Sequence, residues 1–109
     1  MKTTQDVIKD FYKSILVVIT RNSSKNYGLI IFQHMEKKLI KDFPFLDLIK
    51  ISDHNVKIDS KINNIDTKEI RKIFTKIMEI LGPDILKLLI KEHLDSEDMR
   101  YLNQIGVKL

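Results

Sequence analysis

The 109-residue sequence predicts a mainly helical α+β domain, a bundle of four to five helices with one β-hairpin between the second and third helices. Apolar residues recur every three or four positions over most of the chain, which is the spacing of one helical face. Between residues 46 and 59 the spacing changes to two, the period of a strand. No repeat, low-complexity tract or linker divides the chain, so we expect a single domain over residues 1–109.

The amino-terminal third predicts two helices. The first covers about residues 5–19, where apolar residues keep helical spacing even through a tail rich in β-branched side chains. The second helix follows a turn with capping side chains and covers about residues 24–43. Pro44 ends it, because the residue before a proline is pushed toward extended geometry.

The second helix has two contrasting sides. Its apolar side is formed by Ile31, Phe32, Met35 and Leu39. The opposite side is basic and carries His34, Lys37, Lys38 and Lys41. This separation predicts that the apolar side faces the core and that the basic side faces solvent.

Residues 46–59 predict the β-hairpin, with a two-residue turn at 53–54. The expected register pairs Ile49 with Ile58 and Ile51 with Val56. It places these four apolar side chains on one face of the hairpin. A lone hairpin is marginally stable in water, so this face must pack on the helices or on a second copy of the chain. Residues 60–64 are expected to form a polar connector.

The strongest helical pattern lies in the second half of the chain. A helix is predicted over about residues 66–81, where Asp66 is placed to cap the first turn and Glu69 to complete a capping box. Its apolar residues span an arc of roughly 160°, which predicts contacts with more than one neighbour. Helical period, capping residues and the break at Gly82 and Pro83 agree only in residues 65–94, so we expect this stretch to organise the chain.

Two shorter helices complete the prediction. Gly82 and Pro83 end one helix and open the next, which covers about residues 83–94. Asp95 or Ser96 caps a last helix over about residues 96–105, which Gly106 ends.

Composition limits the classes of function. The formal net charge is +4, with the basic excess in residues 1–41. The sequence contains no cysteine, which excludes thiol redox chemistry, zinc–thiolate sites and disulfide bonds. No apolar run is long enough to cross a bilayer, and charged residues interrupt the amino-terminal segment where a signal peptide would be apolar. We expect a cytoplasmic protein with no membrane contact.

No motif in the sequence predicts catalysis. The sequence shows no nucleophile elbow, phosphate-binding loop, dinucleotide-binding fingerprint or metalloprotease motif. His34 belongs to the basic side of the second helix, His54 to the hairpin turn and His93 to a helix end. We therefore expect neither an enzyme nor a cofactor or metal site.

Two functions remain after these exclusions. The favoured one is a non-catalytic protein–protein interaction or regulatory domain that self-associates, as a homodimer, through its amphipathic helices. A helix of a partner protein could cover the same apolar surface. The alternative is a small basic DNA-binding or chromatin-associated protein. Its candidate nucleic-acid contacts are Arg21, Lys25, Lys37, Lys38 and Lys41.

Overall fold

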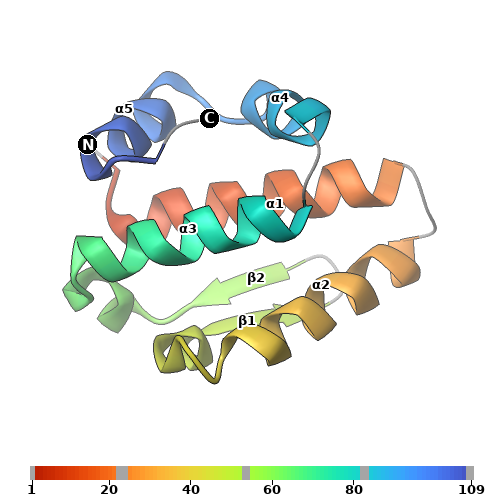
Figure 1. Ribbon diagram of the computed structural model, residues 1–109, viewed down its shortest axis with the longest axis horizontal. Helices are drawn as coiled ribbons and strands as arrows, with labels where there is room; N and C mark the ends of the chain where they lie inside the picture. Colours follow the sequence, from red (N-terminus) through yellow and green to blue (C-terminus); the bar gives the residue numbers. More distant parts are fainter. Residues whose placement is uncertain (1, 22–24, 53–54, 82–83, 108–109) are drawn as a thin grey trace.

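The computed structural model (Figure 1) describes residues 2–21, 25–52, 55–81 and 84–107, apart from the side chains of residues 20, 21, 25–28, 81 and 84–86. The elements follow the order α1 (Thr4–Arg21), α2 (Lys25–Leu39), the 3-10 helix η1 (Pro44–Leu48), β1 (Ile49–Ser52), β2 (Asn55–Ile58), the 3-10 helix η2 (Ser60–Asn64), α3 (Thr67–Leu81), α4 (Asp84–Glu92) and α5 (Ser96–Ile105). The predicted fold class, mainly helical with one hairpin between α2 and α3, is confirmed.

The central element of the fold is α1. It runs antiparallel to α2 and also contacts β2, η2, α4 and α5 (Figure 1). Its buried side chains are Val7, Ile8, Phe11, Tyr12, Ser14, Ile15 and Val18. A helix that is apolar on more than one face packs in the middle of a domain. The prediction that residues 65–94 organise the fold is therefore wrong, because α1 packs against more of the described elements than α3 or α4 does.

Aromatic pairs join α1 to its neighbours. The rings of Phe11 and Phe74 meet edge to face, with centroids 4.5 Å apart. Tyr12 makes the same kind of contact with Phe32, at 5.0 Å. Such pairs contribute about 0.5–1.5 kcal/mol each beyond the area they bury. On α3 the described part of the broad apolar face is covered within one copy of the chain, and Ile80 is the exception at 50% exposure.

The second helix is shorter than predicted. It ends at Leu39, and residues 40–42 form a turn in which the Phe43 N–H donates to the Leu39 carbonyl at 2.9 Å. Phe43 itself has left the helical region, with φ −131° and ψ 75°. Because Pro44 excludes helical geometry at the residue before it, the chain unwinds before it reaches the proline.

The register of the hairpin is confirmed: Ile49 pairs with Ile58 and Ile51 with Val56. The first strand is shorter than predicted, because residues 44–48 form η1 instead of a strand start. The predicted connector of residues 60–64 forms η2. The carboxylate of Asp59 caps η2 by accepting from the Lys61 N–H at 2.9 Å. This local turn buries Ile62 completely. The predicted hairpin turn at 53–54 lies outside the described residues.

The helices of the second half begin within one residue of their predicted positions. Asp66 caps α3 by accepting from the Lys68 N–H at 2.9 Å, while the Glu69 carboxylate contacts Lys72 instead of completing the capping box. The capping box is found at α5, between Asp95 and Asp98. The predicted break at residues 82–83 lies outside the described residues.

Candidate interaction surface

The solvent-facing side of α2 mixes apolar and basic side chains. We name it the outer face of α2; its members are Ile30, Ile31, His34, Lys37 and Lys38. All five are exposed, and Ile30 retains 62% and Ile31 41% of its accessible surface. At about 100° per residue they fall within an arc of about 120°, opposite the buried Phe32, Met35 and Leu39.

The basic residues predicted from the sequence are only partly brought together. Lys37 and Lys38 lie side by side on the outer face of α2, and Lys41 is exposed in the turn that follows. Within the described part of the chain, none of these three ammonium groups takes part in a hydrogen bond or ion pair. Arg21 ends α1 and Lys25 begins α2, but their side chains are outside the described part.

The isoleucines of this face were not identified from the sequence. The sequence places Ile31 on the buried side, and this prediction is wrong because only a narrow arc of α2 packs against α1 and β1. A finer projection could have identified Ile30, which falls within about 40° of His34 and about 20° of Lys37. Large exposed apolar residues also occur on other helices: Val17 on α1, Ile80 on α3 and Leu88 on α4.

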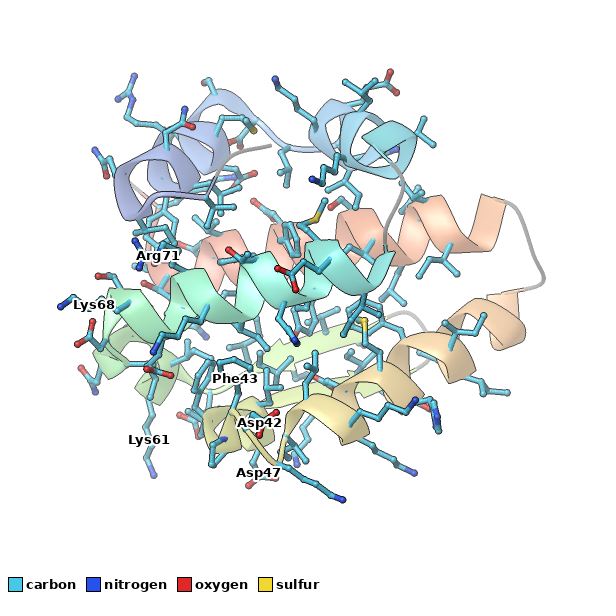
Figure 2. The ribbon with its side chains drawn as sticks, in the orientation of Figure 1. Asp42, Phe43, Asp47, Lys61, Lys68 and Arg71 are labelled. Atoms are coloured by element: carbon cyan, nitrogen blue, oxygen red, sulfur yellow. The ribbon has the colours of Figure 1, made fainter. Side chains whose placement is uncertain are left out.

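A groove lies between α3 and the turn after α2. Figure 2 shows Asp42 and Phe43 beneath α3, with Lys68 and Arg71 on the amino-terminal half of that helix. The groove encloses about 520 Å³ and is lined by Asp42, Phe43, Arg71, Lys72, Thr75, Lys76 and Glu79. Lysines here neighbour glutamates, with Lys72 3.2 Å from Glu69 and Lys76 3.9 Å from Glu79. Because both basic and acidic side chains line the groove, it has no uniformly positive potential that would attract an anion.

A second charged cluster ties the start of the chain to α5. The ammonium group of Lys2 contacts the carboxylates of Asp10, Asp95 and Asp98. These three carboxylates lie within 4.8 Å of one another, a spacing that could hold a metal ion, but Lys2 fills the position between them. Burial raises the pKa of Asp98 to about 6, whereas the aspartates hold the pKa of Lys2 well above its ordinary value. The geometry is that of a structural clamp.

Beside this clamp lies a hollow of about 570 Å³. Its lining comes from the start of α1, from η2 and from α5: Lys2, Thr3, Thr4, Asn63, Glu97, Arg100, Tyr101 and Gln104. Several of these groups already have partners, since the hydroxyls of Thr4 and Tyr101 are 2.6 Å apart and Asn63 Oδ1 accepts from the Gln5 N–H at 2.9 Å. The side chains of Glu97, Arg100 and Gln104 make no hydrogen bond or ion pair with the described residues, so the hollow keeps polar groups that could contact a ligand.

Among the described side chains of α2, the titratable group that faces inward is Glu36. Burial raises its pKa to about 7, against the opposing effects of the Tyr12 hydroxyl and the positive charge of Lys50. Burial, and next the charge of Glu36, raise the pKa of Tyr12 well above its ordinary value. Tyr12 Oη and Glu36 Oε1 are both buried without a hydrogen-bond partner among the described residues. This pair places a carboxyl that titrates near neutral pH between α1 and α2.

The histidines do not form an acid–base site in the described part of the chain. His34 is exposed on the outer face of α2, and His93 is exposed just after α4. Neither imidazole makes a hydrogen bond or ion pair with a described residue, and His54 lies outside the described residues. The expectation that the chain is not an enzyme stays a prediction.

No protein-family model matches this chain, and no curated protein or solved structure is significantly similar to it. Among the described residues, every helix is too short or too polar to cross a lipid bilayer. The cytoplasmic location expected from the sequence stays a prediction.

Proposed function

We propose that this chain is a non-catalytic protein–protein interaction domain whose contact surface is the outer face of α2. The observation that carries the proposal is the exposure of Ile30 and Ile31 beside solvated lysines. Fully burying an isoleucine side chain contributes about 1.5–3 kcal/mol. A partner that covers both residues therefore gains apolar burial that the single chain leaves unused.

Self-association is one form of this function. The sequence favours a homodimer because the chain has many apolar faces. In the structure, however, one copy of the chain already covers much of this apolar surface. Several large apolar side chains in the described part of the main helices stay strongly exposed: Val17, Ile30, Ile31, Ile80 and Leu88. Figure 1 places the carboxyl ends of α1 and α3 and the amino end of α2 toward the same end of the molecule. A second copy could cover this end, and the solution mass at increasing protein concentration tests it.

The proposal is tested by comparing the proteins that co-purify with three forms of the chain. Ile30→Ser combined with Ile31→Ser removes the apolar part of the outer face of α2. Ile40→Ser is the matched control, because Ile40 is also exposed, at 37%, but lies in the turn after the helix. We expect partners that are retained by the wild type and the control and lost by the double variant. Partners that the double variant retains would contradict the proposal.

A DNA-binding function is the second candidate, and one observation favours it. The exposed side of the hairpin places Lys50 directly opposite Lys57, which extends the basic residues of α2 across the two strands. Like charges in this position cost about 0.2–1 kcal/mol, which a bound phosphate would offset. However, Asp47 already pairs with Lys50 at 2.9 Å. Duplex binding that weakens steeply with salt, and weakens further in Lys37→Glu/Lys41→Glu, would favour this function.

A further inference from the structure

The outer face of α2 changes character along its length. Its amino-terminal part is apolar, with Ile30 and Ile31, and its carboxyl-terminal part is cationic, with Lys37 and Lys38. The two parts are seven residues apart in sequence, which is about 10 Å along a helix. His34 lies between them. This face is therefore apolar at one end and cationic at the other, and a partner must present complementary groups in the matching order.

The face does not match a second copy of itself. In a symmetric dimer the same patch is used on both copies. If the two copies of α2 ran antiparallel across the axis, each isoleucine pair would meet the partner's lysine pair and bury ammonium groups against apolar surface. If they ran parallel, the lysine pairs would meet each other and repel. A symmetric dimer centred on His34 would leave one part of the face unsatisfied in either arrangement, so the whole face does not fit a second copy of itself.

We infer that the outer face of α2 binds an acidic amphipathic helix of another protein, with its carboxylates on Lys37 and Lys38 and its apolar anchors on Ile30 and Ile31. This inference rests on the proposed function and names the kind of partner. The two lysines make no ion pair with the described residues, so their charge is available to an acidic partner. Opposite charges fix the register of such a complex, and the apolar anchors supply the buried area.

The helix dipoles also indicate the direction of the bound segment. Acidic residues are favoured in the first turn of a helix, so the amino end of the partner lies beside the lysines near the carboxyl end of α2. The bound helix then runs antiparallel to α2, and its apolar anchors follow its acidic pair by about seven residues. This spacing specifies a probe peptide.

The probe is a labelled helical peptide of about 16 residues, with a glutamate pair in its first turn and a leucine pair about seven residues later. A second peptide carries lysines in place of the glutamates. Fluorescence anisotropy at about 0.1 M salt compares their dissociation constants for the full chain. We expect the wild type to bind the acidic peptide at least about tenfold more tightly than the basic one.

Three variants test the contacts. Lys37→Glu combined with Lys38→Glu is expected to reverse the preference, so that the basic peptide binds more tightly. Ile30→Ser combined with Ile31→Ser is expected to weaken the acidic peptide by at least about tenfold. Lys72→Glu combined with Lys76→Glu makes the same change of charge on the exposed side of α3 and is the control for general electrostatic attraction. It is expected to change binding less than about twofold. All six positions are exposed, so circular dichroism should show unchanged helix content.

Four outcomes would overturn the inference. The first is that the wild type binds the acidic and the basic peptide equally tightly. The second is that the α3 control loses as much binding as the Lys37→Glu/Lys38→Glu variant. The third is a homodimer that dissociates when Ile30 and Ile31 are replaced, since the occupant would then be a second copy. The fourth is a DNA duplex that outcompetes the peptide and binds independently of the isoleucines. If co-purified partners still depend on the isoleucines while the peptide preference does not reverse, the proposed function stands and this inference fails.

Discussion

Replacing Glu36 by glutamine removes a carboxyl group that is half-buried between α1 and α2. Burial raises its pKa from the ordinary value of 4.5 to about 7 in the folded chain. In the unfolded chain the same group ionises at its ordinary value. Between these two values the folded state holds a proton that the unfolded state has lost. The free energy of unfolding therefore falls as the pH rises from about 4.5 to about 7, and the loss is complete above that range.

The size of the effect follows from the same two pKa values. Their difference, at about 1.36 kcal/mol per pKa unit, gives an upper limit of about 3.4 kcal/mol. Because the side chain is half-buried and water screens it, we expect about 1–2 kcal/mol. Glutamine keeps the shape of the side chain, carries no charge, and can donate its amide N–H to the hydroxyl oxygen of Tyr12. Glu36→Gln should therefore stabilise the chain at pH 8 and leave its stability nearly unchanged at pH 5.

Urea unfolding followed by circular dichroism measures this difference at the two pH values. The difference between wild type and variant isolates Glu36 from other titrating groups, such as Asp98. Glu79→Gln is the control, because Glu79 is an exposed glutamate on α3. A variant that is less stable than the wild type at pH 8, or a gain in stability that is equal at pH 5 and pH 8, would contradict the raised pKa of Glu36.

Three further predictions concern stability, and thermal or urea unfolding checks each of them. Lys2→Met should destabilise the chain more at pH 8 than at pH 5, because the aspartates around Lys2 lose their cation while ionised; an equal loss at both values would contradict the clamp. Ile62→Ala should cost about 2–5 kcal/mol because Ile62 is completely buried, whereas Ile80→Ala should cost less than about 1 kcal/mol; similar costs would contradict the burial of η2. Gly106→Ala should cost about 1–2 kcal/mol of stability, since Gly106 has φ 91° and a Cβ atom would lie 3.1 Å from Arg71 Cδ. An unchanged melting temperature would be inconsistent with this conformation.

The parts of the fold that follow from local pattern could be predicted from the sequence. The hairpin register is set by alternation around Ile51 and Val56, and the starts of α3 and α5 are set by capping at Asp66 and Asp95. Ile62 could not be placed, because its short polar surroundings show no period and only the tertiary contacts of η2 bury it. Periodicity reports local geometry, so such isolated core residues escape it.

Only part of the candidate surface could be predicted, because the sequence pattern reports local geometry and not tertiary contacts. Lys37 and Lys38 could be assigned to the solvent side of α2 because lysines are almost never buried without a partner. Ile30 and Ile31 could not, because an apolar residue at the edge of a helical face is buried only if a neighbouring element reaches it. The clamp at Lys2 could not be predicted from the sequence pattern, because Asp95 and Asp98 lie 93 and 96 residues away from Lys2.

The measurement that bears most directly on the outer face of α2 maps where a partner helix binds. Titration of the ¹⁵N-labelled chain with the acidic helical peptide, followed by NMR, shows which amides the peptide affects. We expect the largest amide shift changes at Ile30, Ile31, His34, Lys37 and Lys38. Changes concentrated on α3 or on the hairpin, with α2 unaffected, would contradict this expectation.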